Sequence, residues 1–557
     1  MKRRDFLKTG LKIGVAANAL PVILGGFPVR ALGRSPLRSA LESSSSANNN
    51  VLVIIQLQGG NDGLNCVVPF TDSHYATLRP TLGLTSSEIT TALPDHSSLA
   101  FHSGMDGFLT LYGNGGGSGN MALIQNVGYP NPILSHFRGT DVWNTATDSG
   151  IYASSGWIGR FIAGQYGAPP TTSGSWPLGI EFGNALSDIF LAANGGMGIA
   201  MNEMPSKASP GGQNYDPIPS NPTTQYDELA FVRLIQQESA IYSQTIVSQT
   251  LAANKVTYPS STLATQLAGI ARMIASQLQN GGTAQTKIYL VTQGSYDTHS
   301  DQISRQASLL TDLSAAALAF QQDIEAFGIA DNVAVLSYSE FGRRPAENGS
   351  GTDHGTSAPH FIIGTQVIGK VYGSDPKLDA ASLAGENSGP AGAVPSGNMI
   401  YDANYDFRNV YATVINEWLL AGADQTTINT AIQDILTQDT SATYSTNSKW
   451  NASLGFFKTS AQSVGSSAYT PGLMLLQNYP NPAYASTTIP YVLQSSGQVE
   501  LGIFTSAGVE IARPVDGWQS AGPQQTNFDA SKLTSGAYFY RLTTASGTVT
   551  RPMVVEH

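Results

Sequence analysis

Carboxylate and histidine side chains recur after three apolar segments of this chain, and together they could bind a metal ion. The segments are 51–57, 287–292 and 333–337, and Asp62 follows the first of them through a glycine turn. The candidates after the second and third segments are Asp297, His299, Asp301, Glu340, Asp353, His354 and His360. Imidazole nitrogen combined with carboxylate oxygen suits zinc, manganese or a similar divalent ion. Because aspartate before glycine or threonine is also common in turns, the prediction rests on recurrence rather than on one residue.

A serine–histidine pair offers a second kind of chemistry. Ser135 and His136 precede the amphipathic stretch 138–145, which predicts a helix. The start of a helix favours an anion, so Ser135 could be a nucleophile activated by a metal. Ser135 could equally be a plain helix N-cap, and His136 could be a ligand, a base or a packed residue.

The elements that must position these residues alternate between strands and helices. Apolar runs of strand length occupy 51–57, 287–292 and 333–337. Helical spacing of apolar residues occurs around 226–251, 262–278, 303–327 and 407–420. This alternation predicts an α/β fold with a doubly wound, mainly parallel sheet. Such folds bind ligands at the carboxyl ends of their strands, where the candidate residues fall.

Composition narrows the class of protein. The chain has 557 residues, of which 12% are charged, and a formal net charge of -11, which argues against nucleic-acid binding. Its single cysteine, Cys66, excludes an intramolecular disulfide and a cysteine-based zinc cage.

The N-terminus has the pattern of an export signal. Arg3 and Arg4 begin an Arg-Arg-x-Phe-Leu-Lys run, and the apolar stretch 13–27 that follows is shorter than a typical membrane span. The run matches the twin-arginine signature, although an ordinary secretory signal is the alternative. We therefore expect a twin-arginine signal peptide at 1–33, a polar linker at 34–49, the twin-arginine translocase as partner, and no permanent transmembrane span.

The C-terminus predicts a separate small domain at 471–557, after a linker at 449–470. Short alternating strands at 499–504, 509–511, 537–543 and 548–555 indicate an antiparallel β-sandwich. The Asn-Tyr-Pro-Asn-Pro motif at 478–482 and the Gly-x-Tyr-x-Tyr-Arg-Leu strand at 536–542 resemble the type IX secretion C-terminal sorting domain. The resemblance implies the type IX machinery as partner and a secreted or surface location in a Gram-negative bacterium. A carbohydrate-binding or spacer sandwich is the alternative.

The α/β domain, expected at 50–448, resembles the family known as domain of unknown function 1501. The motifs that carry the resemblance are 57–63, Ser135-His136-Phe137, Asp297-Thr298-His299 with Gln302, 339–343, 351–355 and Asp406-Phe407-Arg408. That family is grouped with the alkaline phosphatase and sulfatase superfamily. The resemblance implies an alkaline-phosphatase-like sheet and hydrolysis or transfer of phosphate or sulfate esters at a two-metal site.

The resemblance also implies roles for individual residues. Ser135 resembles the nucleophile, and Arg343 could neutralise substrate oxygens. The implied ligands are Asp62, Asp353 and His354 for one metal, and Asp297, His299 and His360, with Asp301 as a further candidate, for the other.

The chain departs from the superfamily pattern after its third strand. Glu340 stands where an Asp-His pair is expected, and Asp353-His354 comes later. Either Glu340 is the ligand and the later pair lies behind it, or the loop folds back.

Together these features predict an exported, metal-dependent hydrolase of phosphate or sulfate esters. The cofactor would be one or two divalent ions, zinc, manganese or calcium, and the catalytic candidates are Ser135, His136 and Arg343. The alternative is a non-catalytic surface protein that reuses the fold to bind an anionic ester or a glycan.

Overall fold

The computed structural model describes a large part of the chain and divides it into two compact units. The described residues are 22–24, 27–29, 48–113, 119–129, 132–166, 175–193, 195–204, 241–249, 251–279, 282–379, 405–436, 453–458, 474–475, 478, 483–493, 495–505, 509–520, 522–545 and 547–555. One unit comprises Met1–Leu436 with Ser453–Lys458, and the other Thr437–Ala452 with Thr459–His557. The expected signal peptide lies outside the described residues, apart from strands β1 (Val22–Leu24) and β2 (Phe27–Val29).

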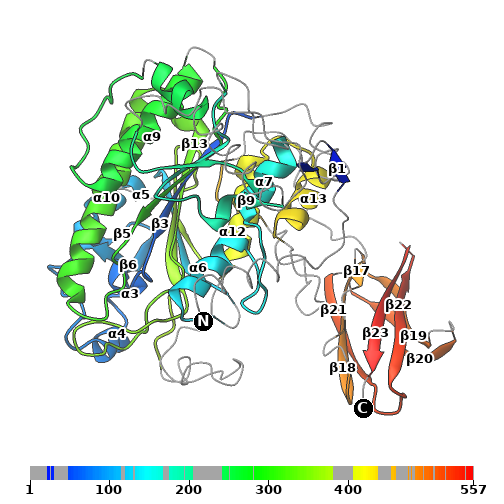
Figure 1. The fold of residues 1–557 in the computed structure, drawn as a ribbon. Helices are drawn as coiled ribbons and strands as arrows, with labels where there is room; N and C mark the ends of the chain where they lie inside the picture. The colour runs from blue at the N-terminus through cyan, green and yellow to red at the C-terminus, as the bar shows by residue number, and fades with distance from the viewer. Residues whose placement is uncertain are drawn as a thin grey trace, which may run out of the picture. The chain divides into compact units, whose positions relative to one another are not determined.

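A mainly parallel sheet forms the centre of the first unit (Figure 1). Within the described residues its strand order is β11-β8-β12-β3-β13-β14-β7-β15, and β16 also pairs with β7. Only β14 runs antiparallel to its neighbours there, so the predicted fold class is confirmed. The strands are β3 (Val51–Leu57), β7 (Met121–Gly128), β8 (Gly179–Phe182), β11 (Ile199–Met201), β12 (Ile288–Gln293), β13 (Val333–Tyr338), β14 (Ala358–Ile363), β15 (Val371–Tyr372) and β16 (Tyr405–Asp406).

Strand β3 lies between β12 and β13, and the apolar run that predicted it is buried along its whole length. Side chains alternate across a strand, so Val53 and Ile55 join one core cluster while Leu52 and Ile54 face the other side. Burial on both faces explains why the sequence is continuously apolar rather than alternating. The register places the carboxyl ends of β3, β12 and β13 together, since Leu57 pairs with Gln293 and Gln56 with Tyr338.

Helices cover both faces of this sheet (Figure 1). One face carries α5 (Asp106–Tyr112), α9 (Thr262–Leu278) and α10 (Gln302–Ala326). The other carries α6 (His136–Thr145), α7 (Trp157–Tyr166), α12 (Phe407–Val414) and α13 (Gln425–Leu436). This is the doubly wound arrangement predicted from the sequence. Among the described residues, no helix combines the length and apolar character that crossing a membrane requires.

Short elements connect these layers. A small antiparallel sheet has the order β4-β6-β5, and β9 pairs with β10. Their bounds, with those of the remaining short helices, are α3 (Gly63–Cys66), β4 (Val67–Val68), α4 (Ser73–Leu78), β5 (Ile89–Leu93), β6 (His96–His102), η1 (Ser103–Met105), η2 (Asp188–Phe190), β9 (Leu191–Ala192), β10 (Gly195–Gly196), η5 (Ala330–Asn332) and the π-helical turn η6 (Ile415–Leu419).

Part of the expected linker at 449–470 packs on the first unit. The described segment Ser453–Lys458 forms an isolated bridge between Phe457 and Val367, and the Phe457 ring stacks on Trp418 at 5.1 Å. These contacts make the segment part of the first unit rather than a free connection.

The second unit is made of antiparallel strands, as predicted. Its described strands form two sheets, β17-β18-β21 and β20-β19-β22-β23. Their bounds are β17 (Met474–Leu475), β18 (Ser486–Leu493), β19 (Gly497–Thr505), β20 (Glu510–Gln519), β21 (Gly522–Asp529), β22 (Gly536–Thr544) and β23 (Gly547–Val555). Alternate residues Tyr538, Tyr540 and Leu542 of β22 enter the core, and the Tyr540 hydroxyl accepts a hydrogen bond from the Asn478 N–H at 2.8 Å. The two sequence motifs of this domain therefore touch each other.

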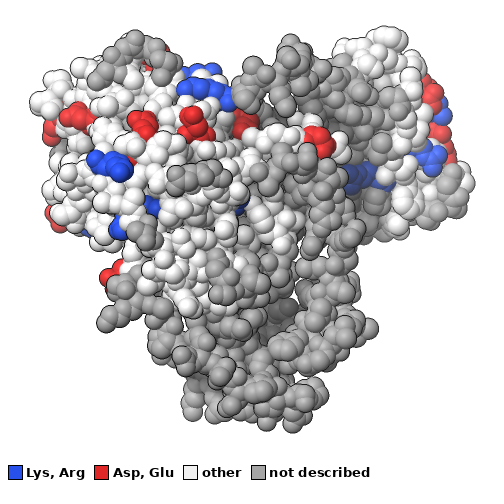
Figure 2. All heavy atoms as spheres, turned by 90° about the horizontal axis from the view of Figure 1, so that it is seen from above, with Lys and Arg blue, Asp and Glu red and all other residues white. Residues whose placement is uncertain are grey.

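Charged side chains are sparse on the described surface. On the face shown in Figure 2, acidic and basic residues form small separate groups between wide uncharged areas. This agrees with a sequence in which 12% of residues are charged.

Candidate metal centre

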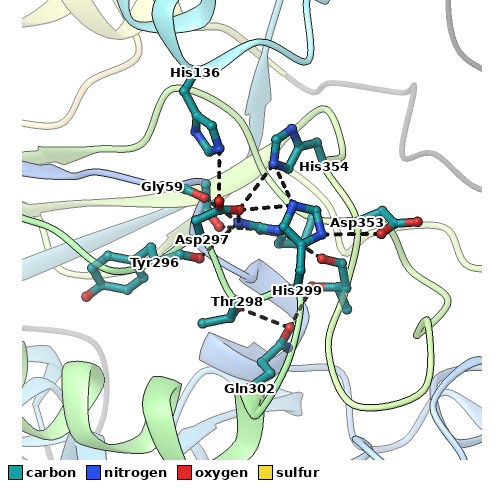
Figure 3. Close-up of polar contacts among 12 residues, drawn as sticks. Gly59, His136, Tyr296, Asp297, Thr298, His299, Gln302, Asp353 and His354 are labelled. Atoms are coloured by element: carbon teal, nitrogen blue, oxygen red, sulfur yellow. Dashed lines mark hydrogen bonds and ion pairs between the residues drawn. The ribbon is translucent and has the colours of Figure 1, made fainter.

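Three segments far apart in the sequence bring histidine and aspartate together at the carboxyl edge of the central sheet. His136, Asp297 and His354 each place one possible ligand atom within 4.8 Å of the others. His136 begins α6, Asp297 follows β12, and His354 lies in the loop between β13 and β14. Figure 3 shows their side chains, with that of His299, gathered around the Asp297 carboxylate.

The Nε2 atoms of three histidines face that carboxylate. His299 Nε2 lies 3.1 Å and His354 Nε2 lies 3.2 Å from Asp297 Oδ1, while His136 Nε2 lies 3.4 Å from Oδ2. The Nε2 atoms of His299 and His354 are 3.0 Å apart. Four potential donors thus converge on a small volume that is open to solvent, since the Asp297 side chain is 46% exposed.

The other ring nitrogen of His354 is hydrogen-bonded to a backbone oxygen. Its Nδ1 lies 2.8 Å from the backbone carbonyl of Leu134. A carbonyl oxygen only accepts hydrogen bonds, so this ring carries its proton on Nδ1 and keeps a lone pair on Nε2. Burial lowers the pKa of His354, which favours the neutral ring.

The other two histidines follow the same pattern. His136 Nδ1 lies 2.8 Å from Glu340 Oε1, and His299 Nδ1 lies 3.3 Å from Asp353 Oδ1. Carboxylates or carbonyls behind metal-bound histidines have this arrangement, because they fix the ring and its tautomer. Glu340 and Asp353 therefore lie behind the site, and the loop folds back to bring in His354.

Asp297 supplies the negative charge at the centre. Partial burial acts to raise its pKa, but the hydrogen bond from Arg343 and the positive charge of that guanidinium outweigh burial and lower the pKa to about 2. Lone pairs on neutral imidazoles would repel this carboxylate and one another at such distances unless a cation lay among them. The donor set fits a divalent ion that accepts imidazole and carboxylate ligands, such as zinc or manganese.

The glycine turn after β3 makes the close approach of these loops possible. Gly59 has a φ of 123°, and a Cβ there would lie 2.3 Å from the Asp297 nitrogen. Its N–H also donates to Glu340 Oε1 at 2.9 Å. A side chain at this position would push the Asp297 loop away from the sheet edge.

The sequence resemblance implies that Arg343 faces the substrate. In the structure, Arg343 is instead buried beneath the cluster. It donates to Asp297 Oδ1 at 2.7 Å, to the Gly60 and Thr352 carbonyls at 2.8 Å each, and to the Gly59 and Tyr296 carbonyls. These acceptors engage the guanidinium N–H groups of Arg343. Its role is therefore to connect the three loops through hydrogen bonds.

Asp62 is likewise placed away from the expected ligand position. Its carboxylate forms a buried ion pair with Arg79, at 2.5 Å from Nη1 to Oδ2 and 2.8 Å from Nη2 to Oδ1. It also accepts from the Gln302 amide and, as the cap of α3, from the Leu64 N–H at 3.2 Å. Both oxygens are engaged by protein groups, and Asp62 is not one of the three clustered ligands.

His360 and Asp301 also lie outside the cluster. His360 is buried in β14 and stacks on Trp143 at 4.9 Å, where burial lowers its pKa to about 3 and keeps it neutral. It is a core residue because its strand faces the aromatic layer under α6. Asp301 precedes α10 with a left-handed φ of 53°, and its exposed side chain makes no capping bond.

Ser135 occupies the N-cap of α6, as predicted, with an exposed side chain that makes no capping hydrogen bond. Its two neighbours in the chain both serve the cluster, Leu134 through its carbonyl and His136 through its ring. The hydroxyl is therefore not committed to the helix.

Sequence reasoning missed three groups that complete the site. They are Arg79, which neutralises Asp62, the Leu134 carbonyl behind His354, and Asn348, which donates to Asp353 at 2.9 Å. A backbone carbonyl carries no sequence signal. The other two are ordinary polar residues whose partners are 17 and 5 positions away.

These features define an α/β protein with a histidine–carboxylate centre at the edge of its sheet. Residues 124–387 match the family described as "Protein of unknown function (DUF1501)", and residues 477–556 match the "Secretion system C-terminal sorting domain". Both resemblances stated from the sequence motifs are thus confirmed, and the second match indicates export through type IX secretion to the surface or the outside. No curated protein matches the chain.

Solved structures give only distant similarity. One is the lipoteichoic acid synthase LtaP from Listeria monocytogenes, with 11% identity, 57% of this chain and 65% of that chain covered, and a TM-score of 0.21. The chain thus spans just under two thirds of that synthase. Another is a sulfatase from Bacteroides thetaiotaomicron that belongs to a locus for glycosaminoglycan metabolism, with 10% identity, 87% and 90% coverage, and a TM-score of 0.30. Superpositions at this level do not bear on the chemistry of the site.

Proposed function

We propose that this chain is an exported, metal-dependent hydrolase of phosphate or sulfate esters. The observation that carries the proposal is the directed set of imidazoles: three Nε2 atoms face Asp297 while each Nδ1 is held by an oxygen. His136, Asp297, His299 and His354 would hold the ion. A bound divalent ion would polarise an ester oxygen and increase the acidity of a coordinated water or hydroxyl.

We expect one ion rather than two. The second ligand set implied by the resemblance does not assemble, because Asp62 pairs with Arg79 and His360 stacks in the core. Three imidazoles favour zinc or manganese over calcium, which prefers oxygen ligands.

Ser135 is the proposed nucleophile. It stands at the N-terminus of a ten-residue helix, where free N–H groups stabilise negative charge, and its hydroxyl is exposed beside His136. A water molecule is the alternative nucleophile, and the Ser135→Ala variant separates the two. With serine as nucleophile, hydrolysis falls by several orders of magnitude, whereas with water it changes little.

Arg344 is the proposed partner of the substrate anion. The guanidinium of its neighbour Arg343 already donates to several carbonyl oxygens. Arg344, in contrast, makes a single side-chain hydrogen bond among the described residues, from Nε to the His354 carbonyl at 3.3 Å. In that part of the chain no ion pair joins Arg344 to a carboxylate. The remaining guanidinium donors can bind two oxygens of a phosphate or sulfate group.

Export completes the proposal. We propose that the N-terminal arginine pair sends the chain through the twin-arginine translocase, which carries folded proteins, and that the C-terminal domain then engages the type IX machinery. Loading of the metal before transport would fit this order.

The test is hydrolysis of aryl phosphates and aryl sulfates by the purified exported protein. Activity should disappear with a chelator, return with added zinc or manganese, and be absent in Asp297→Asn and His354→Ala. An open site, with His299 45% and Asp353 51% exposed, also suits a surface protein that binds an anionic ester or glycan without cleaving it. Metal binding without hydrolysis of any tested ester would favour that second function.

A further inference from the structure

A buried glutamine lies behind the metal centre and links its two ligand loops. Gln302, the first residue of α10, has no exposed surface. Its side-chain oxygen accepts hydrogen bonds from the hydroxyl of Thr352 at 2.6 Å and from that of Thr298 at 3.2 Å. Its amide group donates to Asp62. The amide also donates to Gln306 Oε1 at 3.5 Å, so this side chain makes four bonds, two of them to the loops that carry the ligands.

The two threonines are neighbours of ligands in the chain. Thr298 stands between Asp297 and His299, and Thr352 precedes the Asp353-His354 pair. The loops also bond directly, from the Thr352 N–H to the Thr298 carbonyl at 3.2 Å, and the Gln302 N–H donates to the Ser350 carbonyl at 3.0 Å. Because His299 and His354 bring their Nε2 atoms within 3.0 Å of each other, small shifts between these loops would change the metal geometry directly.

Asp62 and Arg79 fix the orientation of the glutamine amide. A carboxylate paired with arginine only accepts, so the Gln302 amide must turn its NH₂ toward Asp62 and its oxygen toward the threonines. Arg79 also donates to the carbonyls of Pro345 at 2.8 Å and Arg344 at 3.0 Å, in the loop after β13. The arrangement therefore spans all three strand ends.

We propose that Asp62, Arg79 and Gln302 form a positioning relay that sets the separation of the His299 and His354 imidazoles. Asp62 acts through hydrogen bonds and holds no metal itself. The metal-affinity part of this inference rests on the proposed function, whereas the imidazole positions do not. The relay explains why a carboxylate at the end of the first strand is buried and paired rather than turned toward the ligands.

Substitutions that keep the volume and remove one bond test the relay. Thr352→Val removes the shortest of the threonine bonds, and Gln302→Glu keeps the acceptor but places a second carboxylate against Asp62. The double variant Asp62→Asn/Gln302→Glu restores a donor and an acceptor in reversed positions. Gln321→Leu is the matched control, because Gln321 is also buried on α10 but donates to Glu325 Oε1 at 2.8 Å, away from the relay and both threonines.

The measurements are cobalt(II) affinity, the visible absorption spectrum of the cobalt form, the thermal midpoint, and NMR of protein labelled with ¹⁵N-histidine. We expect Thr352→Val and Gln302→Glu to weaken cobalt binding by about 10- to 100-fold and to change the cobalt spectrum, as loss of groups behind a metal ligand does. The double variant should regain much of the affinity of the parent protein. Gln321→Leu should leave the cobalt affinity and the spectrum unchanged.

The outcomes separate this inference from the proposed function. If the relay variants lose stability but keep the parent's cobalt spectrum, affinity and histidine signals, the network is only structural and the inference is wrong. If the parent binds no cobalt, the proposed function fails. The relay then stands if the His299 and His354 signals move in Thr352→Val but not in Gln321→Leu, and is overturned if they do not move in Thr352→Val.

Discussion

Asp297 is the residue on which the site converges. Arg343 below it and three imidazoles around it all contact its carboxylate, and together they set its charge and its direction. The atoms behind the imidazoles matter as much as the ligands, because they decide which nitrogen keeps its lone pair. Each prediction at this scale therefore changes one contact of this group.

Removal of one imidazole should remove the metal. In His354→Ala, His136 and His299 still face Asp297, but loss of one of the four proposed ligands weakens the binding of the ion. We expect the variant to lose its metal on dialysis, measured by elemental analysis. His74→Ala is the control, since that histidine is half exposed and its ion-pair partner within the described part of the chain is Asp72, and it should retain the metal.

The carboxylate behind His136 should tune affinity without being a ligand. Glu340→Gln keeps the side-chain volume but weakens the acceptor for His136 Nδ1 and for the Gly59 N–H. We expect metal affinity to fall by about 10- to 100-fold, measured by competition with a chelator. Complete loss of the metal would instead show that Glu340 binds the ion directly.

The core position of His360 gives a pH dependence with a definite sign. Burial lowers its pKa to about 3 in the folded protein, below the value of about 6.5 in an unfolded chain. The unfolded state thus binds more protons below pH 6.5, so stability falls as the pH drops through that window. The loss from this residue should reach about 2 kcal/mol at pH 5.

Denaturant unfolding of the parent and of His360→Leu at pH 7.5 and pH 5 measures this contribution of His360 to the free energy of unfolding. The variant should lose about 2 kcal/mol less than the parent between the two values. An equal loss in both proteins would mean that His360 does not titrate on unfolding.

At the scale of the elements, the strands that hold the site could be predicted closely. The run 333–337 became β13 (Val333–Tyr338), and 287–292 became β12 (Ile288–Gln293). These strands are buried on both faces, so their whole length is apolar and their ends are marked by polar turns. Helix α9 has the expected bounds because apolar spacing and the Ser261 cap agree.

The partners of polar residues could not be predicted in the same way. His299 and His354 followed from their position at strand ends, and both lie in the centre. Asp62 has the same sequence signature, yet its carboxylate forms an ion pair with Arg79 and does not join the centre. Its fate depends on a buried contact between two side chains, and neither propensity nor periodicity carries information about such contacts.

The glycine turn after β3 offers a test at this scale. Gly59→Ala would place a Cβ 2.3 Å from the Asp297 nitrogen at a φ of 123°. We expect a loss of about 1–3 kcal/mol in the free energy of unfolding, together with weaker metal binding, because the Asp297 loop must move. Gly150→Ala, where a Cβ meets nothing within 4 Å, should change the free energy of unfolding by no more than about 0.5 kcal/mol.

At the scale of the whole molecule, the two units serve different ends. The first carries the centre and the second matches a secretion sorting domain. In the second unit, Asn478 is buried and bonds to Tyr540, so its two recognisable motifs form one structure. The histidine–carboxylate cluster and the sorting-domain match therefore lie in separate cores.

Separate cores predict separable phenotypes in the producing bacterium. A chain that ends after Lys458 should retain hydrolase activity in cell extracts but should not reach the surface or the medium, measured by fractionation and immunoblotting. A change of Arg3 and Arg4 to lysine should hold the full chain at the inner membrane. Normal export of that lysine variant would mean that the general secretory route is used.

The central claim is that three imidazoles and one carboxylate hold a single divalent ion. X-ray absorption spectroscopy of the purified, zinc-loaded protein tests it most directly. The account predicts one zinc per chain, with nitrogen and oxygen neighbours at about 2.0–2.2 Å and the multiple-scattering signal of three histidines, and no retained zinc in dialysed His354→Ala. A protein that binds no zinc, or a bound zinc without a histidine signal, would contradict it.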